Sequence, residues 1–345
     1  MIRFNNDYVS NAHPRILARL QETAGEQNSG YGTDSHCEKA RAYIRGACAA
    51  PEADVHFIAG GTQANAVIIT SILRPHQGVI SADTGHIATH ETGAIEAMGH
   101  KVLALPGSEG KITAEQIQAC HTAHWADEAH EHIVQPGLVY ISHPTESGTV
   151  YTLAELEAIH AVCRKAGLPL MLDGARLGYG LAAMGTDVTL EDVARLCDVF
   201  YIGGTKVGAL FGEAIVIQNP RFKQDFRYLI KRQGALLAKG FLLGIQFECL
   251  FEDGLYMDLG RHGVEEALYL RQAILDRGIP LRYDTGTNQQ FLLLPNEAVE
   301  KLREQFGFSI WEKPDEAHSV IRICTSWATR REDVDTLIRA LGDLA

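Results

Sequence analysis

The sequence lacks the features that mark membrane, nucleic-acid-binding and secreted proteins. No apolar run approaches the roughly 20 residues that span a bilayer, so we expect no membrane partner. Basic residues are in short supply, with 31 Lys and Arg against 43 Asp and Glu and a formal net charge of −12. Because nucleic-acid binding needs clustered positive charge, we expect no nucleic-acid partner. No basic stretch followed by an apolar one stands at the N-terminus, which argues against a signal peptide.

The cysteines do not indicate disulfide pairing. All seven are scattered along the chain, their number is odd, and none forms a CxxC pair. Such a pattern favours reduced thiols over a disulfide framework. We therefore expect a soluble protein in the cytoplasm.

The length of the chain predicts more than one domain. Its 345 residues exceed the roughly 250–300 residues at which single hydrophobic cores stop growing. Hydrophobic residues at 46% and charged residues at 21% are ordinary for a globular protein. We expect an N-terminal segment over residues 1–15, a large domain over 16–250 and a smaller domain over 251–345.

Short apolar runs alternate with helix-like spacing through most of the chain, which predicts an α/β fold with a largely parallel sheet. Ligands of such sheets bind beyond the carboxyl ends of the strands. After residue 250 the pattern changes to that of an α+β domain. The predicted strands are 55–58, 78–81, 101–105, 138–142, 168–172, 198–202, 213–217, 288–294 and 320–325, and the predicted helices include 62–73, 152–166, 190–196, 264–276, 299–305 and 331–344.

Two of the predicted strands are followed by a charged residue suited to cofactor chemistry. One runs into Asp173-Gly-Ala-Arg176, and the other into Gly203-Gly-Thr-Lys206. Partial burial lowers the pKa of a lysine and frees its amine to form an imine. An aspartate can keep a pyridine nitrogen protonated, which makes the ring an electron sink. Taken singly, Asp173 could cap a helix and Lys206 could be a solvated loop charge; their order and spacing favour the chemical interpretation.

A third motif, Ile58-Ala-Gly-Gly-Thr-Gln63, joins a strand to a helix. Small residues there expose backbone N–H groups at the start of the helix, which is a ready site for a phosphate group. Helix N-caps use the same residues, so the motif gains its weight from the other two.

Together these motifs resemble the threonine aldolase and β-eliminating lyase family of fold-type I pyridoxal 5′-phosphate (PLP) enzymes. Gly-Gly-Thr, Asp-x-x-His, Asp-Gly-Ala-Arg and Gly-Gly-Thr-Lys follow in the same order, and the resemblance extends from Asn5-Asn-Asp-Tyr8 to Ile321-Arg-Ile-Cys-Thr-Ser-Trp327. It is greatest to the low-specificity L-threonine aldolases and phenylserine aldolases. The resemblance implies a mostly parallel seven-stranded sheet in the large domain, and cleavage of the Cα–Cβ bond of L-threonine, L-allo-threonine or related β-hydroxy-α-amino acids to glycine and an aldehyde.

The resemblance also implies roles for the residues of these motifs. Lys206 forms the imine with PLP, and Asp173 pairs with the pyridine nitrogen. Arg176 contacts the 3-oxygen of the ring, while Gly61 and Thr62 bind the phosphate.

Further site residues follow from the same resemblance. His86 is expected over the pyridine face, and His132 matches a second active-site histidine; either could move the proton of the β-hydroxyl group. Arg322 matches the arginine that grips the substrate carboxylate, and Asn6 is a further candidate for substrate binding. The alternatives are a surface loop for His132 and a structural ion pair for Arg322.

One position departs from the family. Many threonine aldolases have an arginine where Glu146 stands, and that arginine also holds the substrate carboxylate. An ionised Glu146 would repel the carboxylate, so we expect it to turn away or to be neutralised by a neighbour, which leaves Arg322 as the main anchor.

The resemblance implies a homo-oligomer, at least a dimer and by family likeness a tetramer. The segments Tyr31-Gly32 and Lys231–Lys239 are candidates for the interface. One of Lys231, Arg232 and Lys239 could reach a phosphate, although a solvated helix face explains them nearly as well.

Other functions stay open at this point. Cys120, His121, His124, His130 and His132 crowd one segment, and His86 and His90 have the i, i+4 spacing of metal ligands, so a metalloenzyme is one alternative. No ligand quartet emerges, and we expect no metal. Another β-eliminating lyase, a racemase or a transferase is the alternative among PLP enzymes, because fold and cofactor do not fix the reaction.

Overall fold

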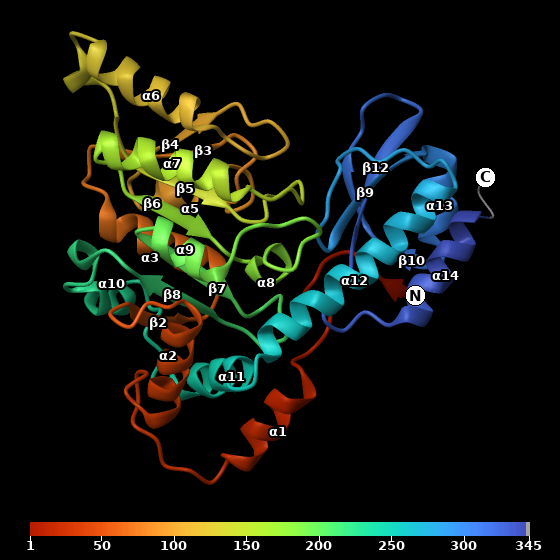
Figure 1. Cartoon of the computed structure of the whole chain (residues 1–345), viewed down its shortest axis with the longest axis horizontal. Helices are drawn as coiled ribbons and strands as arrows, with labels where there is room; N and C mark the ends of the chain where they lie inside the picture. The colour runs from red at the N-terminus through yellow and green to blue at the C-terminus, as the bar shows by residue number, and fades with distance from the viewer. Residues whose placement is uncertain (343–345) are drawn as a thin grey trace.

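The computed structural model describes residues 1–342, and its centre is a seven-stranded sheet (Figure 1). The strands are β2 (Asp54–Ile58), β3 (Gln77–Ala82), β4 (Val102–Leu105), β5 (Gln135–Ser142), β6 (Leu170–Asp173), β7 (Val199–Gly203) and β8 (Glu213–Ile217). Their order is β2-β8-β7-β6-β5-β3-β4. Strand β8 is antiparallel to both of its neighbours, and the other pairings are parallel. The prediction of a mostly parallel seven-stranded sheet is confirmed.

Successive strand residues point to opposite faces of this sheet, and each face is buried under helices. One hydrophobic cluster takes Val139, Ile141 and Phe200 from the strands, and a second takes Leu138, Tyr140 and Tyr201. The first cluster is completed by α2 (Ser35–Ala47), α6 (Ala114–Ala126), α7 (Leu153–Ala166), α9 (Leu190–Leu196) and α11 (Phe241–Phe251). The second is completed by α3 (Gly61–Ile72), α5 (Ala94–Ala97) and α10 (Phe226–Arg232).

The small domain has a separate core. Strands β9 (Gln289–Pro295), β11 (Ser309–Glu312) and β12 (His318–Cys324) form an antiparallel sheet in the order β11-β12-β9. Helices α13 (Asn296–Arg303) and α14 (Arg331–Gly342) bury this sheet. The N-terminal strand β1 (Ile2–Arg3) pairs in parallel with β10 (Phe306–Gly307). The N-terminal segment therefore packs on the small domain, although it precedes the large one in the sequence.

Helix α12 (Leu255–Asp276) joins the two parts of the molecule (Figure 1). Its first half places Leu259 and Val264 in the core of the large domain, and its second half places Leu270 and Ile274 in the core of the small one. The predicted helix 264–276 captured only the second half. The helix passes from the core of the large domain to that of the small domain between Val264 and Leu270. We had expected the boundary between the domains at residue 250.

The other predicted elements agree with the structure to within a few residues. The shorter elements are α1 (Pro14–Glu22), α4 (His86–Thr89), α8 (Leu177–Gly180), η1 (His130–His132) and η2 (Pro220–Phe222). The predicted end of the last helix at residue 344 lies outside the described residues. Across residues 1–342, helices that combine the length and the hydropathy of a membrane span are absent.

Candidate active site

The site is built where β6 and β7 end side by side. The backbone N–H of Gly203 donates to the carbonyl of Gly174 at 2.9 Å. A Cβ on Gly174 would lie 2.0 Å from the carbonyl oxygen of Tyr201, and one on Gly203 would lie 2.2 Å from that of Ala175. Because only glycine permits so close an approach of two backbones, these two positions place the residues that follow each strand next to one another.

Asp173 is the last residue of β6 and is buried. Its Oδ2 atom accepts hydrogen bonds from Tyr140 Oη at 2.5 Å and Asn65 Nδ2 at 3.2 Å, and its Oδ1 atom accepts from the N–H of Ala175 at 3.0 Å. Burial raises the pKa of Asp173, but the charge of His86 and these hydrogen bonds more than offset that effect, so the pKa is lowered. Asp173 is therefore an anion at neutral pH and suits a cationic ring nitrogen.

Lys206 lies in the turn after β7 and is partly buried. Burial lowers the pKa of its amine, and the nearby charge of Arg176 adds to the shift. Within the described residues, its Nζ atom makes no hydrogen bond or ion pair. An uncommitted amine with a lowered pKa suits imine formation.

Glu213, which sequence reasoning missed, fixes the turn that carries Lys206. Its carboxylate accepts hydrogen bonds from the N–H of Gly204 at 3.1 Å and from Thr205 Oγ1 at 2.9 Å. Burial raises the pKa of Glu213 to about 8. The register of the sheet places it beside Gly203, and a carboxylate at the start of an otherwise apolar strand is the signal that could have identified it.

Helix α3 begins at Gly61 with Gly60 as its N-cap, and no side chain caps it. The first backbone N–H groups of such a helix have no intrahelical partner. A Cβ on Gly61 would lie 3.2 Å from Tyr201 Oη, whereas Gly60 has no atom within 4 Å of its own Cβ position. The geometry leaves an open cradle of N–H groups at Gly61 and Thr62, which fits a phosphate group.

His86 and His90 stand on one side of this group. Their ring centroids are 5.7 Å apart, and His86 Nδ1 lies 2.8 Å from Glu91 Oε1. Burial lowers the pKa of His86, but the hydrogen bond to Glu91 and the charge of Asp173 reverse this, so the pKa is raised. The pKa of His90 is lowered by its partial burial and by the charges of His86 and Arg322. His90 is therefore a neutral base at neutral pH.

Arg176 faces Asp7 from the N-terminal segment. The guanidinium donates from Nε to Asp7 Oδ2 at 2.6 Å and from Nη2 to Oδ1 at 3.1 Å. Asn288 of the small domain donates to Asp7 Oδ2 at 3.0 Å. Burial would raise the pKa of Asp7, but the charges of Arg176 and Lys206 lower it to about 2. Asp7 thus joins three parts of the chain behind Lys206, a role that the sequence did not indicate.

Arg322 points from β12 toward the same site and has no acid partner among residues 1–342. Its Nη1 lies 3.3 Å from Gln289 Oε1, and its Nη2 lies 3.2 Å from the carbonyl oxygen of Asn5. Its Nε is buried and has no hydrogen-bond partner among the described residues. The guanidinium lies 5.1 Å from the ring centroid of Trp311, whose ring is 6.3 Å from that of His90. A cation without a carboxylate partner here fits an anionic ligand, and the structural ion pair that we weighed for Arg322 is absent from residues 1–342.

Two expected residues do not join this group. His132 is exposed and lies at the end of η1, just before β5 begins. It therefore sits at the amino edge of the sheet, opposite Asp173 and Lys206. Asn6 accepts a hydrogen bond from the N–H of Tyr8 at 3.0 Å and lines a cavity with Ser326. The neighbours of Asn6, rather than its own side chain, contact Arg176 and Arg322.

Glu146 lies in the turn after β5 and is buried. Its Oε1 accepts from Ser142 Oγ at 3.2 Å. Burial raises the pKa of Glu146, and the charge of Asp173 raises it further. Within residues 1–342 no Lys, Arg or His forms an ion pair with Glu146, so the neutralising neighbour that we considered is absent there; the raised pKa favours the protonated carboxyl group instead.

The rings of the histidine-rich segment pack against one another in edge-to-face and tilted arrangements. The ring of Trp125 lies 5.1 Å from those of His124 and His130. Nowhere in residues 1–342 do three His, Cys, Asp or Glu side chains assemble in a way that could hold a metal ion.

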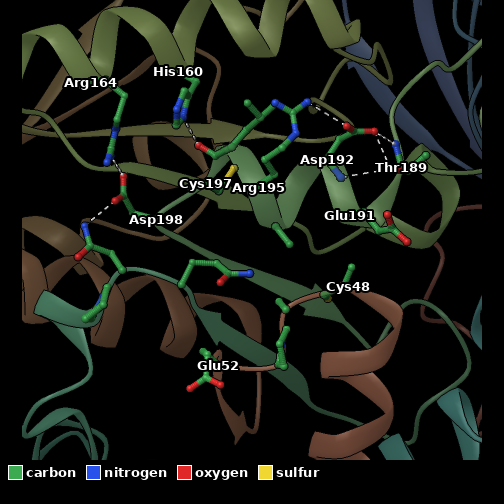
Figure 2. A pocket seen from close by; sticks show the side chains of 18 residues that line it. Cys48, Glu52, His160, Arg164, Thr189, Glu191, Asp192, Arg195, Cys197 and Asp198 are labelled. Atoms are coloured by element: carbon green, nitrogen blue, oxygen red, sulfur yellow. Dashed lines mark hydrogen bonds and ion pairs between the residues drawn. The ribbon is translucent and has the colours of Figure 1, made fainter.

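Figure 2 shows a cavity of about 930 Å³. It is lined by Asp198, which precedes β7, whereas Lys206 follows β7, so the cavity lies at the opposite edge of the sheet. Its charged side chains are largely paired with one another. Arg164 contacts Asp198, Arg195 Nη2 lies 3.1 Å from Asp192 Oδ1, and His160 Nδ1 lies 2.6 Å from the carbonyl oxygen of Leu196. Paired groups leave little capacity for a ligand, so we do not place the active site here.

The residues around Lys206 fit PLP. They offer a free amine, a buried carboxylate for the ring nitrogen, and N–H groups at a helix start for the phosphate. Arg322 provides an unpaired cation for the carboxylate of an amino acid.

Known proteins are similar to the chain over nearly its whole length. The beta-eliminating lyase family matches residues 4–289. A low-specificity L-threonine aldolase of Pseudomonas aeruginosa is 30% identical over 98% of this chain and 96% of its own length, and that of a Pseudomonas sp. (strain NCIMB 10558) is 32% identical over 88% and 87%. A solved threonine aldolase from Leishmania major is 45% identical, with a TM-score of 0.97 over 100% of this chain and 99% of that one. The chain belongs to the beta-eliminating lyase family and has the fold of the fold-type I PLP enzymes.

Proposed function

We propose that the protein is a PLP-dependent aldolase that cleaves L-threonine, L-allo-threonine or related β-hydroxy-α-amino acids to glycine and an aldehyde. The observation that carries this proposal is that Lys206, Asp173 and the unpaired Arg322 meet at one edge of the sheet. The relatives described as low-specificity L-threonine aldolases support the choice of reaction.

The cofactor would be held by residues of the large domain. Lys206 supplies the amine for its covalent attachment, Asp173 pairs with its ring nitrogen, and the N–H groups at Gly61 and Thr62 receive its phosphate. When bound, PLP draws electrons from the bonds at Cα of an amino acid and so allows the Cα–Cβ bond to break. Arg176, which is locked to Asp7, has a fixed position for the 3-oxygen of the ring.

Arg322 would orient the substrate through its carboxylate. A guanidinium binds a carboxylate through two parallel hydrogen bonds, and Arg322 has an uncommitted Nε for this purpose. The bond that breaks is the one held perpendicular to the cofactor ring, so the grip on the carboxylate selects the Cα–Cβ bond.

The β-hydroxyl proton needs a base, and we propose His90 in place of His132. His90 lies beside His86 and Trp311, within the field of Arg322. Its lowered pKa keeps the imidazole neutral, so a ring nitrogen can accept the proton as the aldehyde forms. His86, held by Glu91, keeps the role expected over the cofactor ring.

Product analysis tests the proposed function. Purified protein reconstituted with PLP is incubated with L-threonine, L-allo-threonine and L-phenylserine, and glycine and the matching aldehyde are quantified. Equal amounts of glycine and aldehyde are expected. Ammonia and a keto acid without glycine would instead indicate β-elimination and would contradict the aldolase assignment.

We further propose that the protein acts as a homo-oligomer. Tyr228 is 77% exposed and Tyr31 is 43% exposed, and Lys231 Nζ lies 4.6 Å from the ring centroid of Tyr31. Lys231, Arg232 and Lys239 are exposed and form no ion pair in the described part of the chain. An exposed aromatic and basic surface of this kind supports a subunit contact that brings positive charge to a neighbouring phosphate. Light scattering at assay concentrations should give at least a dimer, and an active monomer would contradict this.

The state of the cysteines supports a reducing compartment, and we propose the cytoplasm. All seven are free, and all except Cys120 are buried. Burial raises the pKa of Cys197 and of Cys163, which keeps these thiols protonated and unreactive.

A further inference from the structure

Glu146 is a buried acid that the steps above do not use. Its side chain is 8% exposed, and its Oε2 atom is buried with no hydrogen-bond partner among the described residues. No Lys, Arg or His of residues 1–342 forms an ion pair with it. A buried carboxylate with no ion-pair partner, and with no hydrogen-bond donor for one oxygen, is costly if ionised.

The other oxygen of Glu146 begins a chain of hydroxyl groups that ends on Asp173. Glu146 Oε1 lies 3.2 Å from Ser142 Oγ, and Ser142 Oγ lies 3.4 Å from Tyr140 Oη. Tyr140 Oη donates to Asp173 Oδ2 at 2.5 Å. All four residues are buried, and Tyr140, Ser142 and Asp173 come from the ends of the neighbouring strands β5 and β6.

Counting the protons along this chain distinguishes the two states of Glu146. If Glu146 is protonated, it donates to Ser142, Ser142 donates to Tyr140, and Tyr140 donates to Asp173. Every hydroxyl hydrogen then has an acceptor, and a single negative charge remains, on Asp173. If Glu146 is ionised, Ser142 must turn toward it, its Oε2 keeps a buried charge without a donor, and two carboxylates repel each other.

We propose that Glu146 is a positioning residue whose carboxyl group is protonated. It donates a hydrogen bond to Ser142, Ser142 donates to Tyr140, and Tyr140 donates to Asp173, so that this series of hydrogen bonds fixes the carboxylate of Asp173. This inference rests on the proposed function, because it assigns Asp173 to the ring nitrogen of PLP. The direction of the pKa shift, raised by burial and by the charge of Asp173, agrees with it.

The first test is infrared spectroscopy of the full-length holoenzyme at neutral pH. A protonated carboxyl group absorbs apart from a carboxylate, and we expect such a band in the wild type that disappears in Glu146→Gln. The matched control is Glu297→Gln, since Glu297 has an 83% exposed side chain and should contribute only a carboxylate band. If the wild type shows no protonated-carboxyl band that is lost in Glu146→Gln, the proposal is overturned.

The second test is the pH dependence of thermal stability. The folded-state pKa of Glu146 is raised above its ordinary value of 4.5, so its stabilising contribution is present below that value and is lost as pH rises toward the folded pKa. Glutamine does not titrate, and the Tm of Glu146→Gln should therefore gain on that of the wild type as pH rises above about 4.5. A Tm difference that stays constant with pH would show that Glu146 is ionised in the folded protein.

The difference in Tm between the wild type and Glu146→Gln separates the titration of Glu146 from that of its neighbours. The charged and titratable groups that act on Glu146 are Asp173, His86 and Arg176, and Tyr140 and Tyr151 feel its charge in turn. All of them are present in both the wild type and Glu146→Gln, so the difference in Tm reports Glu146.

The third test uses rescue by a conservative variant. The amide of glutamine can donate to Ser142, whereas alanine cannot. Loss of a buried hydrogen-bond donor should make kcat of Glu146→Ala about tenfold lower than that of Glu146→Gln, with a larger change in the visible absorption of the bound cofactor. Equal losses in both variants would mean that charge, and not donation, is what matters.

The infrared and stability tests do not depend on the reaction catalysed. A wild-type enzyme that retains the Glu146 band but forms no glycine would refute the proposed aldolase and leave the protonation of Glu146 standing. An active aldolase whose spectrum lacks the Glu146 band would refute the protonation of Glu146 and leave the proposed aldolase standing.

Discussion

The two edges of the central sheet differ in how their charges are satisfied. At the amino edge, around a cavity of about 930 Å³, Asp198 accepts from Asn219 Nδ2 at 2.6 Å and from the N–H of Leu170 at 2.8 Å, besides its contact with Arg164. At the carboxyl edge, neither Lys206 Nζ nor Arg322 Nε has a hydrogen-bond partner within the described residues. Charged side chains that are paired within the protein stabilise its fold, whereas charged side chains without such a partner are candidates for binding a ligand.

The largest effect should come from Lys206. Lys206→Ala removes the amine that anchors the cofactor, and aldolase turnover should fall by about ten-thousandfold or more. Borohydride reduction followed by peptide mapping should label Lys206 alone in the wild type and no lysine in the variant. A label on another lysine would refute the cofactor assignment.

Asp173→Asn should be the next largest. An amide cannot hold the ring nitrogen in its cationic form, so kcat should fall by about a hundred- to a thousandfold, although some cofactor still binds. The cofactor content must be measured by absorbance alongside the rate. A kcat near that of the wild type with full cofactor would show that Asp173 has another task.

Arg322→Ala should reduce kcat/KM by about thirty- to a thousandfold. The reason is loss of the charged partner for the substrate carboxylate, and Arg322→Lys should recover part of the activity because it keeps the charge but not the paired hydrogen bonds. L-allo-Threonine is the substrate for this comparison. If Arg322→Ala is nearly unimpaired, the carboxylate is held elsewhere.

His90→Asn should lower kcat by about a hundredfold, because the amide cannot accept the β-hydroxyl proton. The acidic limb of the rate profile in the wild type should lie below the ordinary histidine range, since the pKa of His90 is lowered, and this limb should disappear in the variant. His132→Asn is the control, and a loss confined to His132→Asn would restore the original expectation.

The smallest effect on catalysis should follow a change at the amino edge. Arg164→Ala breaks the contact with buried Asp198 and should cost about 1–2 kcal/mol of unfolding free energy, while kcat/KM stays within about twofold. Urea unfolding and steady-state assays measure the two quantities. A large loss of activity in folded Arg164→Ala would show that the amino edge also takes part in catalysis, and would contradict the distinction between the two edges.

Sequence reasoning identified what depends on strand direction and local motif. Asp173 and Lys206 follow strands of the same parallel sheet, so their meeting at one edge could be foreseen. The same logic should have excluded His132, because a residue that precedes β5 lies at the other edge. The family resemblance outweighed that geometric signal.

Other features depend on contacts that no local pattern contains. Asp7 and Arg176 are separated by 169 positions, and their pairing follows only from the docking of the N-terminal segment. His90 entered only the metalloenzyme alternative, through its spacing with His86, and was not expected to be a base. Its place beside Trp311 depends on how the small domain sits over the large one. Glu146 was recognised as unusual, but its link to Asp173 through Ser142 and Tyr140 depends on how β5 pairs with β6.

The N-terminal segment also imposes an order on biosynthesis. Asp7 leaves the ribosome 281 residues before its partner Asn288, and at about 5–20 residues per second this delay is roughly 14 to 56 seconds. The delay is longer still for Phe4, whose carbonyl oxygen accepts a hydrogen bond from the N–H of Cys324 at 2.9 Å in the folded protein. The large sheet can form while the chain is still being translated, but the contacts of Asn288 with Asp7 and of Cys324 with Phe4 form only after the small domain has been synthesised. Chains that stop early would therefore carry a folded sheet with an unfinished active site.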